Sequence, residues 1–184
     1  MLSYLKIGAT VTALALAGSA QAAVIDFTTA TNDGTTLVAT GATATAGAGT
    51  TLAVGDFVAN ALCPLGGFGC NGIMTLTFDA DVSNVTFDYG FGNPGDSASL
   101  SIFDGLGALI SSVLLTSTSG VAFADLSYLG ALRSILFDNS ASTGAGYAYG
   151  NVTYTPAAVP LPASLPLLLA ALGGAALIRR RKTA

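Results

Sequence analysis

The feature that most constrains the fold is an alternation of apolar and polar residues with a period of two. It recurs through the middle of the chain, in Met74–Phe78, Val85–Tyr89 and Ser99–Phe103. Successive side chains of a strand point to opposite faces, so each segment predicts a strand with one buried face. No run of ten or more residues in this middle part has the apolar spacing of an amphipathic helix. The middle of the chain is therefore predicted to be all-β.

Further strand candidates lie between residues that favour turns, such as Asn93-Pro94-Gly95 and Asp104-Gly105. Short strands that return about every ten residues are typical of a β-sandwich. We expect one antiparallel, jelly-roll-like sandwich. Its additional strands are predicted at Val24–Thr28, Thr51–Ala59, Ala108–Thr116, Gly120–Leu126, Ala131–Asp138 and Gly146–Tyr154.

The segment Ala39–Gly49 has low sequence complexity and consists of small side chains. Two interpretations fit it, a flexible connection or a strand that buries little apolar surface. We predict a mobile loop here.

The N-terminus has the layout of a secretory signal peptide. An apolar stretch at 7–18 is followed by small residues, Ala20 and Ala22, which fit the pattern before a signal-peptidase site. Residues 1–22 are predicted to direct export through the Sec translocon and to be removed after Ala22, with cleavage after Ala23 as the alternative. A signal-anchor helix or a buried amphipathic helix is the competing interpretation.

The C-terminus is predicted to hold the chain in a membrane. Residues 161–178 form an uncharged, mostly apolar run of 18, close to the minimum length for a membrane-spanning helix. A core helix of the domain is the alternative, but such a helix has a polar face. A basic stop follows the run and favours a cytoplasmic C-terminus; it consists of Arg179, Arg180, Arg181 and Lys182.

The tail also carries a recognisable motif, Val159, Pro160, Leu161, Pro162 and Ala163, ahead of the apolar run and the basic end. Residues 159–184 resemble the VPLPA-CTERM sorting signal, a variant of the PEP-CTERM class of Gram-negative bacteria. Leu161 stands where the main class has Glu, as in the variant. The resemblance implies that an exosortase-type membrane enzyme cleaves near the motif and that the body passes to the cell surface or an exopolysaccharide matrix. An uncleaved single-pass tail is the alternative.

Removal of both signals leaves residues 23–158, which suit a single domain. This body contains all ten acidic residues, which are aspartates, and one basic residue, Arg133, so its net charge is −9. Such a surface disfavours nucleic acid and anionic lipid as partners. It remains compatible with Ca²⁺ and with neutral polymers.

The residue types present limit catalysis. The chain has no His, Glu or Trp, and its two lysines, Lys6 and Lys182, lie in the terminal signals. The usual general base, the Ser–His pair and the Schiff-base amine are therefore missing from the body. A pair of aspartates acting as in glycosidases is the remaining possibility. We predict that the protein is not an enzyme and has no cofactor other than a candidate Ca²⁺ ion.

Cys63 and Cys70 are the two cysteines of the chain. In an exported protein an even cysteine count predicts a disulfide. Pro64 and the glycines between them favour the tight return that the bond requires. Two thiols without histidine cannot complete a zinc shell, so we expect a structural bond before the strand at Ile73.

Two weaker hypotheses concern ligands. Asp79 and Asp81 supply hard oxygen ligands at i, i+2 spacing and are the first candidates for Ca²⁺; solvated turn aspartates are the alternative. Tyr147 and Tyr149 project from one strand face and, with Asn151, are candidates for an aromatic strip that binds a neutral polysaccharide. Packing of both tyrosines in the core is the interpretation that we favour for that strand.

Taken together, these features predict an exported protein of structural or interaction type. It is expected to be tethered to the inner membrane with its body in the periplasm, and then sorted to the cell surface or matrix. A carbohydrate-binding module for exopolysaccharide is the alternative, and a small Asp-based glycoside hydrolase is a further one.

Overall fold

The computed structural model describes residues 21–157, except 56–57, 68 and 117–119. These residues form one compact unit. Most of the predicted signal peptide, with Ala20, lies outside the described residues, as does the whole predicted tail at 159–184. No helix within the described part is long and apolar enough to cross a membrane.

The described residues form twelve strands and one short 3₁₀ helix, η1 (Ser127–Leu129), and every pairing between the strands is antiparallel. The predicted all-β class is therefore confirmed. The strands are β1 (Ala23–Val24), β2 (Thr31–Asn32), β3 (Thr36–Ala39), β4 (Ala42–Ala46), β5 (Thr51–Gly55), β6 (Ala61–Leu65), β7 (Ile73–Gly90), β8 (Ser97–Phe103), β9 (Leu109–Thr116), β10 (Ala122–Asp125), β11 (Leu132–Asp138) and β12 (Ala148–Pro156).

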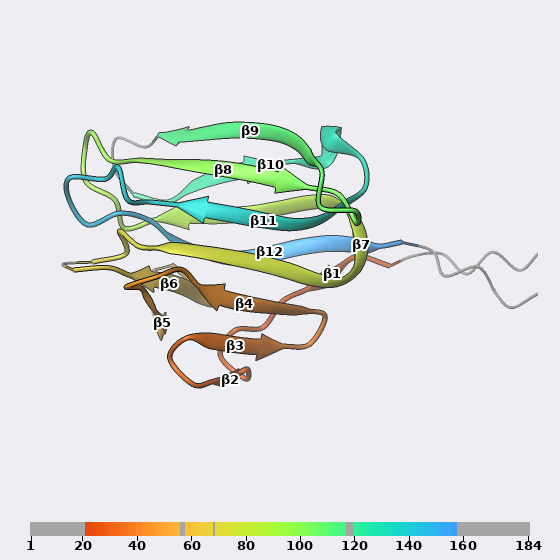
Figure 1. Ribbon diagram of the computed structural model, residues 1–184, viewed down its shortest axis with the longest axis horizontal. Coiled ribbons are helices and arrows are strands. Elements are labelled where there is room, and N and C mark those ends of the chain that lie inside the picture. The colour runs from red at the N-terminus through yellow and green to blue at the C-terminus, as the bar shows by residue number, and fades with distance from the viewer. Residues whose placement is uncertain (1–20, 56–57, 68, 117–119, 158–184) are drawn as a thin grey trace, which may run out of the picture. The chain divides into compact units, whose positions relative to one another are not determined.

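The long strand β7 belongs to both layers of the fold (Figure 1). Its first half pairs with β4 and β11, and this layer continues through β8 to β9 on one side and through β3 to β2 on the other. Its second half pairs with β10 and β12. The second layer continues from β12 to β1, β6 and β5. We call these two groups of strands layer 1 and layer 2.

The strand β7 replaces two shorter strands that were predicted separately, at Met74–Phe78 and Val85–Tyr89. Asn84 has a φ of 51°, in the left-handed region that asparagine tolerates better than most residues. A residue in this conformation shifts the alternation by one position, as in a β-bulge. The buried side chains accordingly change from even to odd positions: Met74, Leu76, Phe78 and Val82, then Val85, Phe87 and Tyr89.

Aromatic side chains join the two layers in the core. Phe137 of layer 1 packs on Tyr149 of layer 2 with ring centroids 4.2 Å apart. Phe78 similarly meets Tyr154 at 5.1 Å. Tilted and edge-on rings of this kind add to the stability gained from burial alone. The predicted sandwich is thus confirmed as two layers around one apolar core.

The prediction of a mobile loop at Ala39–Gly49 is wrong, because most of that segment is the strand β4 and the end of β3. Ala42 and Ala44 are buried, whereas Thr43 and Thr45 face outward. β4 pairs with β7 over five consecutive residues. Backbone pairing and small inward side chains therefore suffice to form a strand with little apolar area of its own.

Candidate functional site: an open patch on layer 2

The aromatic strip considered for the last strand does not form. Tyr147 and Tyr149 are 0% and 1% exposed, so both side chains lie in the core. The favoured interpretation, in which these tyrosines pack in the core of the sandwich, is the one that the structure supports. Asn151, the third residue of that hypothesis, lies on the outer face of layer 2 and is half-buried.

Both tyrosine hydroxyls find partners inside the protein, which explains how they tolerate burial. The Tyr147 hydroxyl donates to the carbonyl oxygen of Asp96 at 2.6 Å. The Tyr149 hydroxyl donates to the side-chain oxygen of Asn139. Burial raises the pKa of the Tyr149 hydroxyl well above its ordinary value, so it stays a neutral donor.

A bulge in β12 sets the direction of the Asn151 side chain. The register between β12 and β7 shifts between Gly150 and Thr153, and Asn151 has a φ of 48°. Bulges re-aim side chains and are frequent beside functional sites. The Asn151 Nδ2 atom donates to Asp88 Oδ2 on the neighbouring strand at 2.8 Å.

An exposed aromatic ring lies beside this amide–carboxylate pair. Phe123 of β10 is directly opposite Asp88 of β7, so the two side chains share the outer face of layer 2. The Phe123 side chain is 63% exposed. Phe123, Asp88 and Asn151 therefore form a row across three strands, with the apolar ring at one end.

A second polar row extends the surface along the strands. Thr86 and Thr153 lie opposite each other on β7 and β12, and their Oγ1 atoms are 2.5 Å apart. We define the open patch as Phe123, Asp88, Asn151, Thr86 and Thr153.

A loop covers the outer face of layer 2 next to the open patch. At Gly150 a Cβ atom would lie 2.4 Å from the carbonyl oxygen of Ala59, so only glycine allows the loop to lie this close. The Asn60 side chain connects this loop to the segment that follows β1. Its Oδ1 accepts from Phe27 N and its Nδ2 donates to Ile25 O, both at 2.7 Å.

The predicted disulfide between Cys63 and Cys70 is confirmed, with the two Cα atoms 5.1 Å apart. Both cysteines belong to a small buried cluster with Val58, Ala61 and Ala148. This cluster continues the cover over layer 2 beyond Gly150. The open patch lies beside this cover; its residues on β7 and β12 are half-buried and Phe123 of β10 is exposed.

Five of the nine aspartates in the described residues stabilise local turns. Asp33 Oδ1 accepts from the backbone N–H groups of Thr35 and Thr36, and Asp104 Oδ1 accepts from those of Leu106 and Ala108. Further carboxylates of this kind belong to Asp26, Asp125 and Asp138. Such side chains stabilise turns through local hydrogen bonds.

Asp96 is the buried carboxylate among the described residues. Burial opposes its ionisation, but N–H groups of Asn93, Gly144 and Gly146 donate to it and lower its pKa below the ordinary 3.8. A glycosidase acid requires the opposite shift, toward a raised pKa. Asp96 instead ties the turn after β7 to the loop before β12.

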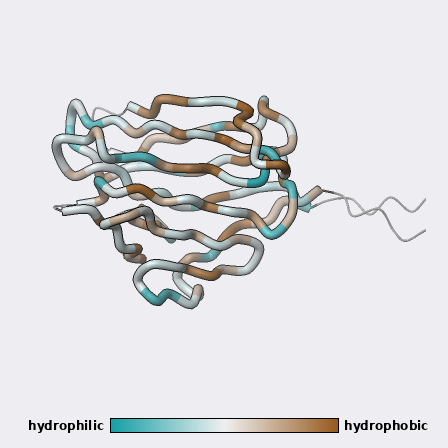
Figure 2. The backbone as a smooth tube through the Cα atoms, viewed as in Figure 1, coloured by the Kyte–Doolittle hydropathy of each residue, from teal (hydrophilic) through white to brown (hydrophobic). Residues whose placement is uncertain are grey.

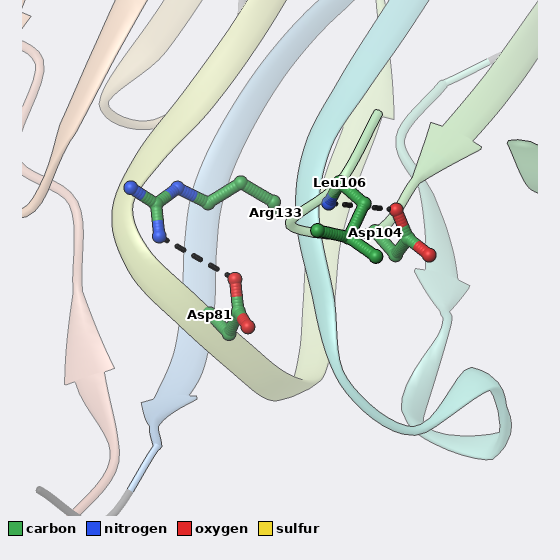
Figure 3. A network of polar contacts seen from close by, with 4 residues as sticks. All are labelled: Asp81, Asp104, Leu106 and Arg133. Carbon is green, nitrogen blue, oxygen red and sulfur yellow. Dashed lines mark hydrogen bonds and ion pairs between the residues drawn. The ribbon is translucent and has the colours of Figure 1, made fainter. Parts of the chain in front are cut away.

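The carboxylates predicted to bind calcium have other surroundings. Asp81 forms an ion pair with Arg133, whose Nη1 lies 3.4 Å from Asp81 Oδ1 (Figure 3). Asp79 is exposed at the bend of β7. Within the described residues no group of three or more His, Cys, Asp or Glu side chains is arranged to hold a metal ion. Among the described residues, Asp79 and Asp81 therefore have no third acidic side chain beside them that could complete a calcium site.

Sequence reasoning found part of the open patch. It singled out Asn151, but it missed Phe123. A signal was present, because Ala122, Ala124 and Leu126 alternate with Phe123 and Asp125. A phenylalanine on the polar side of an alternating strand indicates an exposed ring.

No protein-family model and no curated protein matches the chain. Among solved structures, the chain is similar to a mutant of the carbohydrate-binding module CBM29-2, with 13% identity and a TM-score of 0.49 over 74% of this chain and 92% of that one. It is also similar to a structure described as carbohydrate binding module family 29 (13%, 0.44, 73% and 89%). An arabinose-bound α-L-arabinofuranosidase matches over 61% of this chain and 23% of its own, at 12% identity and a TM-score of 0.41.

Proposed function

We propose that the body is a non-catalytic module that binds a neutral polysaccharide through the open patch. The observation that carries this proposal is the row formed by the exposed Phe123 ring, the Asp88 carboxylate and the Asn151 amide across three neighbouring strands. A ring beside fixed polar groups matches the two kinds of surface that a sugar presents, its C–H face and its hydroxyl groups.

Each member of the row has a distinct part in binding. The Phe123 ring packs against the C–H face of a pyranose and removes apolar surface from water. Asp88 accepts hydrogen bonds from sugar hydroxyls, and ionised acceptors form stronger hydrogen bonds than neutral ones. Because its hydrogen bond to Asp88 fixes the Asn151 amide, little conformational entropy is lost when a sugar binds.

The charge of the surface selects the class of polymer. Asp88 lies in the open patch and Asp125 lies opposite Thr86 beside it, whereas Arg133 is paired with Asp81 in layer 1. Polymers with carboxylate or sulfate groups are repelled by the net charge of −9 on the body. A neutral exopolysaccharide meets no such repulsion.

We also propose that the termini deliver this module to the place where such polymers occur. Signal peptide 1–22 exports the chain, and the motif at 159–163 is read by an exosortase-type enzyme that releases the body to the surface or matrix. The uncharged run at 161–178 and the basic stop at 179–182 support this route.

Affinity electrophoresis of the full chain in mild detergent tests the binding proposal. Gels contain a soluble neutral glucan, a neutral mannan or an anionic polyuronate. We expect retardation by at least one neutral polymer and none by the polyuronate. Phe123→Ala should abolish the retardation. Leu106→Ala, which truncates an apolar side chain that is 96% exposed in the β8–β9 turn, should leave it unchanged. Equal retardation of both variants would refute the role of the patch.

Intact mass of the protein recovered from its host's cell surface tests the sorting proposal separately. A species that begins near Ala23 and ends near the 159–163 motif supports it. A species that still carries Arg179–Ala184 overturns it.

A further inference from the structure

Among the described strands, β9 of layer 1 has a paired strand on one side only, although the Tyr89 hydroxyl donates to the carbonyl of Thr116 at its end. β9 is the last strand in the order β2-β3-β4-β7-β11-β8-β9 and pairs with β8 (Figure 1). An edge strand presents N–H and C=O groups that another strand can pair with. This feature is independent of the open patch, which lies on layer 2.

β9 lacks the devices that usually protect such an edge. Its sequence, LISSVLLT, has no charged residue, proline or glycine over eight residues. Charged side chains, prolines and very short edge strands are the common means of preventing strand addition. A bulge is present at the start of β9, opposite Ile102 and Phe103, but Ser111–Thr116 pairs regularly with β8.

The other edges of the described sandwich are better protected. β10 has four residues and ends in Asp125, and β2 has two residues. The β5 edge is covered by the end of β2 and the turn between β2 and β3. Asn32 Nδ2 donates to Leu52 O at 3.1 Å, and Leu52 N donates to Gly34 O at 2.7 Å. β9 is therefore the edge most open to strand addition.

Apolar side chains are exposed along this same strand. Leu114 is 67% exposed, Leu109 57% and Ile110 38%. Figure 2 shows the hydrophobic colour along β9 at the top of the molecule. Exposed apolar side chains that are contiguous on one element usually mark an interaction surface.

We propose that the occupant of this edge is a second copy of the chain, paired antiparallel through β9 about a twofold axis. An antiparallel pair of identical strands is self-complementary, as a twofold interface requires. A register centred on Leu114 uses residues 112–116, which pair regularly with β8. It places Leu114 against its own copy and Ser112 against Thr116.

The β9 edge allows two copies to meet without bringing charges of the strand together. Two bodies that each carry a net charge of −9 repel each other wherever their aspartates meet. β9 itself carries no carboxylate, so pairing through this strand gives two identical acidic bodies a neutral contact. The twofold axis also places the two Asp104 turns at opposite ends of the pair.

Oxidative cross-linking of the full chain in mild detergent tests the register. Leu114→Cys should form a disulfide-linked dimer at least several times faster than Leu106→Cys, whose more exposed side chain lies in the turn that leads into β9. Peptide mapping should find the bond between the two introduced thiols. Equal rates for the two variants would overturn the proposal.

Sedimentation equilibrium provides a second test that needs no cross-link. The unmodified chain should dimerise, and Leu114→Lys should raise the dimer dissociation constant at least tenfold. Val38→Lys is the matched control, because Val38 is 52% exposed on β3 of the same layer but lies away from β9. A monomer at all concentrations, or a dimer that Leu114→Lys does not weaken, would overturn the proposal. If Leu114→Lys unfolds, the cross-linking result decides.

Discussion

The side-chain amide of Asn139 donates a hydrogen bond of 2.5 Å to the carbonyl oxygen of Cys70, which lies 69 residues earlier in the chain. The same amide donates to the carbonyl of Tyr147 at 2.8 Å, and its oxygen accepts from the Tyr149 hydroxyl. Asn139 is fully buried. One side chain thus links the disulfide loop, the end of β11 and the start of β12.

Replacing Asn139 with alanine should therefore destabilise the fold strongly. The change leaves two buried carbonyls and a buried hydroxyl without this partner, and we expect a loss of about 3 kcal/mol in the free energy of unfolding. Urea unfolding followed by circular dichroism measures it. Asn84→Gly is the control, since it removes one exposed hydrogen bond to Thr155, tolerates the left-handed φ of this position and should cost much less. Similar losses for the two variants would contradict the buried network.

Asp96 should make stability depend on pH in the acid range. Its pKa is lowered from 3.8 in the folded state, so the folded state favours the ionised carboxylate more than the unfolded state does. Its contribution is present above pH 3.8 and is lost as the pH falls through the lower, folded-state pKa. In thermal unfolding between pH 2 and 6, the melting temperature of the unmodified chain should rise with pH, and Asp96→Asn should make this rise smaller. The part of the pH dependence that remains in Asp96→Asn should come from other carboxylates with a lowered pKa, such as Asp33. If the melting temperature of Asp96→Asn depends on pH as strongly as that of the unmodified chain, the hydrogen bonds to Asp96 do not contribute to its stability.

The close approach of the 58–60 loop to β12 can be tested with two glycines. Gly150→Ala places a Cβ atom 2.4 Å from the carbonyl of Ala59, so the loop must move or the bulge must change. We expect a loss of about 1–3 kcal/mol, the usual range for overpacking. Gly67→Ala is the matched control, because no heavy atom lies within 4 Å of its added Cβ. Thermal unfolding should separate the two variants clearly.

The disulfide should contribute to stability through the unfolded chain. The loop from Cys63 to Cys70 is short, and the loop-entropy relation gives about 2–3 kcal/mol for a ring of this size. The double variant Cys63→Ala with Cys70→Ala should lose that amount in urea unfolding. Reductant should destabilise the unmodified chain and leave the double variant unaffected. Equal stability with and without the bond would contradict this contribution.

Period-two alternation was sufficient to predict the fold class, because each strand has one face in the core. It could not show that Met74–Phe78 and Val85–Tyr89 are one strand. That continuity depends on the left-handed backbone of Asn84, which shifts the alternation between them. The strand β4 was missed for a different reason. Its alanines bury little surface, and β4 is fixed by pairing with β7, a contact between residues distant in sequence.

The open patch was only partly predictable because its residues come from three strands. Tyr147 and Tyr149 show why spacing alone misleads, since i, i+2 spacing gives a shared face but not which face. Asn139 and the Asp96 carbonyl accept their hydroxyl hydrogens inside the core, and these partners cannot be identified from local sequence. The opposition of Phe123 and Asp88 likewise depends on the register between β10 and β7.

Asn151 offers the sharpest test of the patch, because two substitutions separate its backbone from its amide. Asn151→Gly keeps the left-handed φ at no steric cost and removes the group that holds Asp88. We expect the chain to remain folded and its dissociation constant for the bound neutral polymer to rise about tenfold, the loss of one charge-assisted hydrogen bond. Asn151→Asp places a second carboxylate beside Asp88, and the repulsion between the two like charges should weaken binding further than Asn151→Gly does. Titration calorimetry with the bound neutral polymer measures both dissociation constants. If Asn151→Gly binds the polymer as tightly as the unmodified chain, the Asn151 amide has no part in recognition. The binding site would then depend on Phe123 and not on the amide.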